Sequence, residues 1–203
     1  GLGGLAGQGK IGIANGIMGL YPAGGEVMKN GVRAPLNDAR SALKNGMAFV
    51  SEDRRGTGLL LDEAIEFNIV ATATQIQGKF LTSGRIPILD ARAMTAYAKS
   101  MIDELDIRCT GPSQLSRRLS GGNQQKVCIA RAITLEPDLL FVSEPTRGID
   151  IGAKKRILDH LVELNRKHGL TIVMTSSDLA ELRSICDRIA IVDEGRLDGV
   201  LLP

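Results

Sequence analysis

The sequence predicts an α/β fold: a parallel sheet with helices against it and a helical lobe inserted between its strands. Three bare apolar runs in the last third of the chain are separated by helical segments, which is typical of parallel strands buried on both faces. They are Leu139–Val142, Leu170–Met174 and Ile189–Val192. The middle of the chain reads instead as helical. We therefore expect one domain over 1–203, with its core at about 1–52 and 136–203 and its lobe at about 53–135.

The remaining elements follow from periodicity and from the positions of glycine and proline. A short apolar segment leads into a glycine-rich turn, and Met47–Val50 is a short apolar run before the charged cluster Ser51–Arg55. Gly169 closes the helix expected before it, as glycine does at many helix ends. Glu194–Arg196 is a turn before a final short strand. The expected helices are Lys10–Leu20, Leu59–Gln77, Ala91–Leu105, Ser120–Thr134, Ile151–His168 and Leu179–Cys186.

Composition narrows the class of protein. The chain has 25 Lys and Arg against 23 Asp and Glu, and only 3% aromatic residues. Both values argue against a basic, stacking nucleic-acid surface, so we expect no nucleic-acid partner. Three widely spaced cysteines without a CxxC pair argue against zinc and against a disulfide framework, and they suit a reducing cytosol. The sequence shows no apolar run long enough to span a membrane and no signal peptide.

The first chemical motif is the glycine-rich segment Gly4–Lys10, which matches the phosphate-cradling pattern GxxxxGK between a strand and a helix. Its glycines let backbone N–H groups turn toward phosphates, and the following helix directs its positive end at them. Lys10 would reach the β- and γ-phosphates. The pattern usually continues with Ser or Thr, a ligand of Mg²⁺, but here that residue is Ile11. An ordinary strand–turn–helix corner is the alternative interpretation.

The second motif is Leu139–Thr146, four apolar residues followed by an acid. A buried strand of this kind delivers a carboxylate to a phosphate site. The usual pair is Asp-Glu, in which Asp holds Mg²⁺ and Glu polarises the attacking water. Here Ser143 stands at the Asp position, and Glu144 is kept. The alternative is a strand end with a solvated glutamate.

The third motif is LSGG, Leu119–Gly122, at the start of an expected helix. A serine and two glycines leave the N–H groups of the helix start uncovered by side chains, which predicts a second anion site. Ser120 would also serve as an ordinary helix cap. A cap alone does not need two glycines followed by Asn-Gln-Gln.

In this order the three motifs resemble those of the ATP-binding cassette (ABC) ATPases, whose signature motif is LSGG. The resemblance covers nearly the whole chain and implies a P-loop NTPase fold with a RecA-like parallel sheet. Finer features make the chain similar to sugar importers of ribose, galactose, xylose or nucleoside type: Ser51–Arg55 with Gly58, Leu59 and Asn68, then LSGGNQQK, then Glu144–Asp150. Those importers fuse two cassettes, and this chain is most similar to the second, beginning after the usual N-terminal β-region.

The resemblance implies a role for each matching residue. Glu144 corresponds to the catalytic carboxylate, and Glu52, Asp150 and Ser177 lie at the switch loops. The nucleotide-binding residues would be Gly4, Gly7, Gln8, Gly9, Lys10, Ile11 and Gly12. The signature residues would be Leu119, Ser120, Gly121, Gly122 and Asn123.

Four positions depart from the family pattern. Ile11 and Ser143 replace the two Mg²⁺ ligands, Ser177 replaces the switch histidine, and Glu52 stands where most cassettes have glutamine. The cofactors implied are ATP and a weakly held Mg²⁺, for which Glu52 offers a replacement oxygen. We therefore expect a site that binds nucleotide and hydrolyses it slowly.

The resemblance also implies partners and a location. They are a second cassette paired head-to-tail, transmembrane permease subunits and, indirectly, a periplasmic or extracellular solute-binding protein. The chain would lie in the cytoplasm against the inner face of the cell membrane. Two alternatives remain: a soluble translation-factor-type ABC ATPase, and a purely regulatory nucleotide-binding cassette. The absence of an NKxD motif argues against a GTPase, and the lack of sustained heptads argues against a chromosome-maintenance ATPase.

Overall fold

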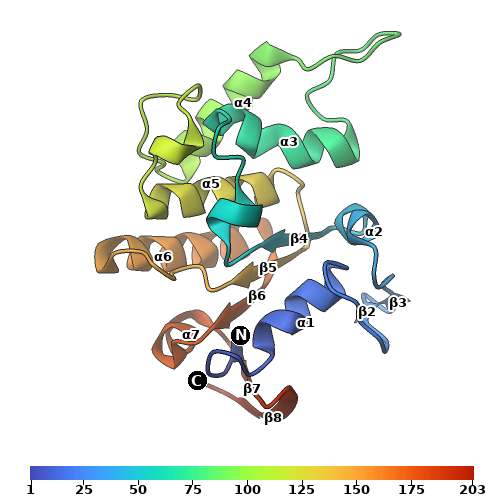
Figure 1. Ribbon diagram of the computed structural model, residues 1–203, viewed down its shortest axis with the longest axis vertical. Coiled ribbons are helices and arrows are strands. Elements are labelled where there is room, and N and C mark those ends of the chain that lie inside the picture. Colours follow the sequence, from blue (N-terminus) through green and yellow to red (C-terminus); the bar gives the residue numbers. More distant parts are fainter. The chain divides into compact units, whose positions relative to one another are not determined.

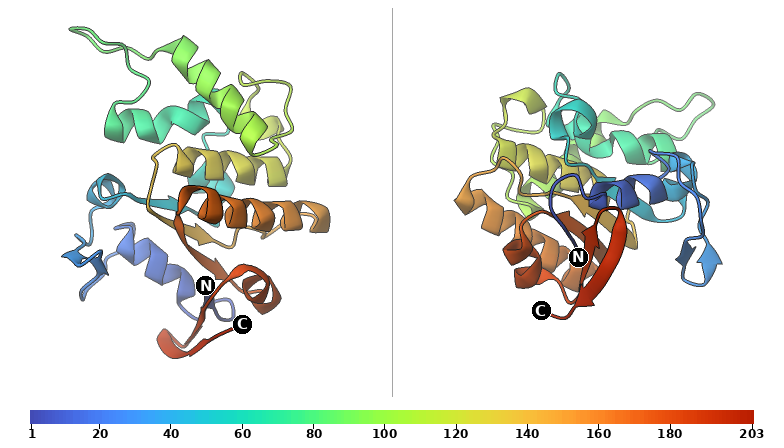
Figure 2. Two further views of the ribbon diagram at one scale, coloured as in Figure 1. Left: turned by 180° about the vertical axis from the view of Figure 1, so that it is seen from behind. Right: turned by 60° about the horizontal axis from the view of Figure 1, so that its bottom comes forward.

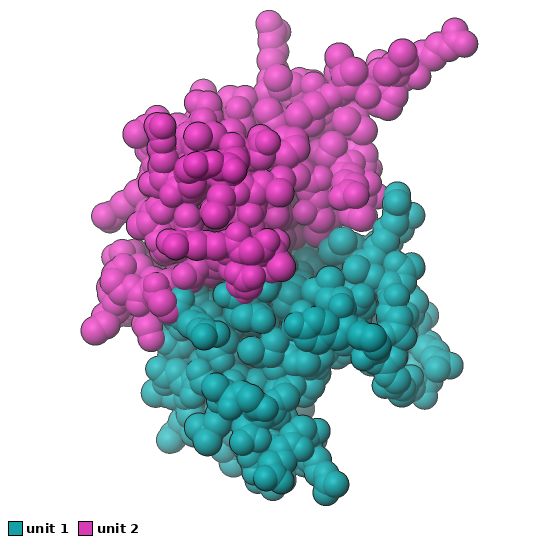
Figure 3. Space-filling model, viewed as in Figure 1, with its two compact units in different colours: residues 1–52, 137–147, 158–203 teal, residues 53–136, 148–157 magenta.

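The computed structural model describes all residues from 1 to 203. The chain divides into two compact units, which Figure 3 shows in different colours. The first unit comprises 1–52, 137–147 and 158–203, and the second comprises 53–136 and 148–157. Parallel strands connected by helices confirm the predicted α/β class.

The first unit is built on a six-stranded sheet in the order β4-β5-β6-β1-β7-β8 (Figure 1). Every neighbouring pair is parallel except β7 and β8, which are antiparallel. The strands are β1 Leu2–Gly3, β4 Met47–Val50, β5 Leu139–Ser143, β6 Thr171–Ser176, β7 Ile189–Asp193 and β8 Arg196–Leu201. The short β1 lies between β6 and β7, so the chain enters the sheet near its middle.

The helices of this unit include α1 (Lys10–Ile17), α2 (Ala39–Lys44) and α7 (Leu179–Ile185). The long helix α6 (Ile151–His168) has residues in both units. One core cluster joins α1 to the sheet: Ala14 and Met18 of the α1 segment are buried with Met47 and Phe141. Figure 2 shows the same elements from two other sides.

The second unit is helical. Helices α3 (Ile65–Gln77), α4 (Ala91–Glu104) and α5 (Gly121–Ile133) pack together, with α3 in contact with both others. A π-helical turn covers Arg54–Gly58 and a 3₁₀ turn covers Ser116–Arg118. Fully buried Ile, Val and Ala side chains form the interior; they are Ile65, Ile69, Val70, Ala73, Ala98, Val127, Ile129 and Ala130.

Several predicted boundaries were wrong. The helix expected from Leu59 begins at Ile65, because the preceding segment is tied to Asn68, whose amide bonds both the N–H and the carbonyl of Leu60. The helix expected to end at Leu20 ends at Ile17, next to Gly19 in the left-handed conformation (φ 71°). Helix α2 and the small hairpin of β2 (Met28–Lys29) with β3 (Val32–Arg33) were not predicted.

Candidate functional site

The sequence motifs of the first unit converge because parallel strands end at the same edge of a sheet. The Gly4–Lys10 loop follows β1, Glu144 follows β5, and Ser177 follows β6. Glu52 lies two residues after β4, which pairs parallel with β5. In open α/β sheets the carboxyl edge is where ligands bind. This edge therefore holds the candidate site.

The glycine-rich loop leaves the start of α1 uncovered. Gly9 precedes the helix in the left-handed conformation (φ 92°), and no side chain caps it. Gln8 instead fixes the loop to the turn after β7. Its side-chain Oε1 accepts from the N–H of Glu194 at 2.6 Å, and its backbone carbonyl accepts from the N–H of Gly195 at 3.0 Å. Gly4 passes so close to β7 that an added Cβ would lie 2.3 Å from the carbonyl oxygen of Val192. The loop is thus held open toward an anion.

Lys10 and Glu144 form a buried ion pair at the centre of the site. The Lys10 Nζ lies 3.2 Å from Oε1 of Glu144, and these side chains are 2% and 9% exposed. Lys10 also donates to the carbonyl of Leu5 at 3.2 Å. The other carboxylate oxygen, Oε2, accepts from the hydroxyl of Ser177 at 3.2 Å. The lysine is therefore positioned to exchange its carboxylate partner for a phosphate.

Two buried hydroxyls near the ends of β5 and β6 have no hydrogen-bond partner. They are Oγ of Ser143 and Oγ1 of Thr175, and both residues are completely buried. The two residues are register partners on β5 and β6, so they lie on the same face of the sheet. Ser143 shares that face with Phe141, which packs in the α1 cluster. Buried hydroxyls normally have a hydrogen-bond partner, so these two are candidates for contact with a ligand or a water.

The residues fit phosphates better than they fit Mg²⁺. Lys10 and the uncapped helix start suit an anion. Magnesium prefers near-octahedral oxygen coordination, but Ile11 offers no side-chain oxygen and no group of three or more His, Cys, Asp or Glu could hold a metal. Glu52, half-buried with its Oε2 3.5 Å from the Ser51 hydroxyl, is the carboxylate predicted for this role. The residues at this edge are therefore those of a candidate anion site, with Ile11 and Ser143 at the positions predicted for metal ligands.

A second set of contacts behind the site was not predicted. The carboxylate of Glu181, on α7, accepts from Thr146 Oγ1 at 2.6 Å and from Ser176 Oγ at 3.3 Å. All three residues are buried. These bonds link the segment that follows β5 to the end of β6 and to α7, in addition to the bond between Glu144 and Ser177. The signal for this link is the burial of Glu181, and the sequence alone does not show that this residue is buried.

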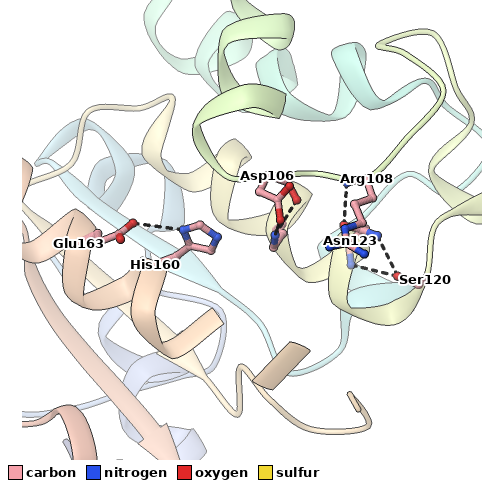
Figure 4. Close-up of polar contacts among 7 residues, drawn as sticks. Asp106, Arg108, Ser120, Asn123, His160 and Glu163 are labelled. Atoms are coloured by element: carbon pink, nitrogen blue, oxygen red, sulfur yellow. Dashed lines mark hydrogen bonds and ion pairs between the residues drawn. The ribbon is translucent and has the colours of Figure 1, made fainter. Parts of the chain in front are cut away.

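The LSGG segment opens α5 in the second unit. Ser120 caps the helix: its Oγ lies 3.5 Å from the N–H of Asn123 and accepts from the Asn123 side-chain amide at 3.0 Å. Asn123 in turn accepts from the N–H of Arg108 at 2.9 Å (Figure 4). Leu119 is buried, and Ser120 is exposed. At this end of the helix Ser120 is exposed, Gly121 is half-buried and Gly122 is buried.

The two signature glycines have different surroundings. An added Cβ at Gly121 would have Arg54 Nη2 and the Gly148 carbonyl as its nearest neighbours, both at 3.6 Å, which is ordinary contact. At Gly122 it would lie 3.1 Å from the Cβ of Ala153, which is tight. Gly122 is therefore required for packing within the unit, and Gly121 is free of that requirement. Asp150 accepts from the N–H of Ala153 at 2.9 Å, which caps the start of α6.

The comparisons identify the family. The ABC transporter family matches residues 1–147, so the chain belongs to it. The ribose import ATP-binding protein RbsA of Lactococcus lactis subsp. lactis is 37% identical over 202 residues, covering 99% of this chain and 40% of the relative. RbsA 2 of Rhizobium meliloti is 42% identical over 200 residues, covering 98% and 38%. The L-arabinose transport ATP-binding protein AraG of Geobacillus stearothermophilus is 38% identical over 203 residues, covering 98% and 38%.

Solved structures confirm the fold. The dimeric ATP-binding cassette MJ0796, bound to ADP and phosphate, superposes with a TM-score of 0.81 at 22% identity, covering 99% of this chain and 83% of that one. CbiO1 of Clostridium perfringens gives 0.75 at 20% identity, covering 98% and 75%. The family match and the curated relatives confirm the predicted resemblance to sugar-import ABC proteins. The chain spans about 40% of the length of these curated relatives, and none of its helices combines the length and apolar character needed to cross a membrane.

Proposed function

We propose that this chain is a nucleotide-binding cassette of a sugar importer that binds ATP at its own site, hydrolyses it slowly, and lends its signature helix to a partner cassette. The observation that carries the proposal is a contrast within one chain. The Lys10 loop and the LSGG segment match the family, whereas three positions that serve metal binding and hydrolysis do not: Ile11, Ser143 and Ser177. The relatives named for ribose and arabinose import support the solute class.

At its own site, the loop amides from Gly4 to Gly12 and the Lys10 ammonium bind the phosphates. Any Mg²⁺ at this site would have Glu52 as its carboxylate and would neutralise phosphate charge. Glu144 occupies the catalytic position and would orient a water. Ser177 holds that carboxylate by its hydroxyl but has no imidazole to share a proton near neutral pH. Nucleotide binding survives these replacements better than hydrolysis does, because the lysine and the loop amides contact the phosphates without a metal ligand or a histidine.

The signature segment serves the partner. In a head-to-tail pair, the start of α5 faces the γ-phosphate of the nucleotide on the other cassette. Ser120 is exposed there and already orients the helix start through Asn123. Gly121 leaves room for the phosphate, and Asp150 lies in the adjoining switch segment. The proposal is thus asymmetric: hydrolysis takes place at the partner's phosphate loop, completed by this chain.

The proposal extends to the assembly. The 203 residues act as one cassette with a core and a helical lobe, and the lobe contacts the permease subunits at the inner face of the membrane. A solute-binding protein delivers the sugar, which does not contact this chain. A purely regulatory cassette is the second candidate, favoured by the same three replacements, and it differs only in having no turnover at all. The translation-factor alternative predicts copurification with ribosomes, whereas our proposal predicts copurification with membranes.

The test measures binding and turnover on the same preparation. The chain is titrated with a fluorescent ATP analogue, and phosphate release is followed at saturating ATP. We expect saturable binding with turnover far below about 1 per second, the low end for efficient phosphoryl-transfer enzymes. Turnover near that value contradicts the proposal. Absence of binding contradicts it as well and would leave only the signature helix as a functional element.

A further inference from the structure

We infer that the nucleotide site of this chain binds the triphosphate without a divalent cation, using the buried hydroxyls of Ser143 and Thr175 where other cassettes use coordinated metal. The inference rests on the proposed function, since it concerns the same ATP site. It goes further by naming the form of the ligand, the metal-free nucleotide, and the groups that select it.

The first argument is the loss of ligands. Both positions that hold Mg²⁺ in the family pattern carry poorer ligands here: Ile11 is aliphatic, and Ser143 offers a neutral hydroxyl in place of a carboxylate. Magnesium gives up its own water reluctantly and is usually held by one or two carboxylates with phosphates. No group of three or more potential metal-binding side chains compensates for the loss.

The second argument is the pair of hydroxyls. Ser143 Oγ and Thr175 Oγ1 are fully buried, and neither has a hydrogen-bond partner. Leaving a buried polar group unsatisfied is destabilising, so each hydroxyl is expected to have a partner when the site is occupied. Both are hydroxyls at register positions on one sheet face. Hydroxyls donate to anions, so a phosphate oxygen, or a water bound to one, satisfies both.

The third argument is charge. A metal-free triphosphate carries more negative charge than its magnesium complex, and a carboxylate beside it adds repulsion. With serine at position 143, Glu144 is the acid at the end of β5, and it is already paired with Lys10. The same replacement therefore removes a metal ligand and a repulsive charge. Lys10 and the uncapped start of α1 remain to balance the phosphates.

The test compares ATP affinity with and without the metal. The 203-residue chain is titrated with ATP in excess EDTA and again in excess Mg²⁺, using calorimetry. We expect ATP to bind in EDTA at least as tightly as in excess Mg²⁺. Affinity that falls tenfold or more in EDTA overturns the inference while leaving the proposed ATP site intact. No binding in either buffer overturns both, so the two failures are distinguishable.

A gain-of-function variant gives an independent readout. Ile11→Ser with Ser143→Asp restores both oxygen ligands, and we expect Mg²⁺ then to tighten ATP binding at least about tenfold relative to EDTA. Ile11→Ser alone, at a half-buried site, is the second variant in case the buried aspartate prevents folding. Manganese retained with ATP on the unsubstituted chain in equilibrium dialysis would contradict the inference directly, because Mn²⁺ uses the same ligands.

Discussion

The hydroxyl of Ser177 donates a hydrogen bond to Oε2 of Glu144 across 3.2 Å, joining the residue after β6 to the residue after β5. This is the position at which the ABC resemblance leads us to expect a histidine. A serine holds the carboxylate in place as an imidazole would, but it does not titrate near neutral pH. Glu144 is thus oriented by two partners, Ser177 and Lys10.

Lys10→Ala tests whether the loop is a working phosphate site. The ammonium is buried at the centre of the site, and a hydrogen bond to a charged group contributes about 1.5–3 kcal/mol. We expect ATP affinity of the chain to fall by about ten- to a hundredfold, measured by titration. Lys29→Ala is the matched control, because Lys29 pairs with Asp138 instead and should leave affinity unchanged. Equal affinity in Lys10→Ala and the unsubstituted chain would refute the assignment.

Asn68→Ala should destabilise the second unit. The side chain is completely buried, and its amide bonds Leu60, the Ser116 hydroxyl and Arg131 Nη2. Its loss leaves several buried groups unsatisfied, each costing about 1–3 kcal/mol. We expect the free energy of unfolding in urea to fall by at least about 3 kcal/mol. Ser100→Ala, on the exposed surface of α4, should change it by less than about 0.5 kcal/mol; equal effects would contradict the role assigned to Asn68.

Burial raises the pKa of the Cys128 thiol from 9.0 to about 12, against the opposing effect of Arg131 and Arg54. The folded state keeps its proton above pH 9, where the unfolded thiol loses it, so the stability from this group is present below pH 9 and is lost as pH rises toward 12. We expect the unfolding free energy to fall by about 1.4 kcal/mol for each pH unit in this window, from Cys128 alone.

Urea unfolding at a series of pH values above 9 checks this prediction. Cys128→Ala should remove that part of the pH dependence, whereas Cys109→Ala, which removes a half-buried thiol, should keep it. Identical pH profiles for the unsubstituted chain and Cys128→Ala would contradict the prediction.

The sequence predicted the local features of the fold well. The bounds of α6 are the predicted ones, since its apolar periodicity and Gly169 are local signals. The motif spacing also placed Lys10 and Glu144 in one site, because parallel strands end together. The position of β1 between β6 and β7 could not be predicted, since it depends on pairing between residues far apart in the chain.

Contacts that depend on tertiary structure were missed for the same reason. Gln8 was predicted among the nucleotide-binding residues, and the sequence did not show that its side chain accepts from the backbone N–H of Glu194, 186 residues away. Glu181 received no role, although it links Thr146 and Ser176. Gly122 was predicted to leave the helix start uncovered, and the sequence did not show that an added Cβ would lie 3.1 Å from the Cβ of Ala153. In each case the sequence shows the residue type but not the distant residue that it contacts.

The central claim is that this chain serves its partner's hydrolysis more than its own, and two variants in the assembled transporter test it. The Cβ of Gly121→Asp fits within the chain, since its nearest neighbours lie at 3.6 Å, but its carboxylate would meet the partner's γ-phosphate and repel it. Lys10→Ala affects only this chain's own site.

The decisive measurement is sugar-stimulated ATP hydrolysis by the two variant transporters. We predict that Gly121→Asp lowers it at least about a hundredfold, while its own ATP binding persists, and that Lys10→Ala keeps hydrolysis within about threefold of the unsubstituted transporter. Near-normal hydrolysis in Gly121→Asp, or its loss in Lys10→Ala alone, would contradict the account.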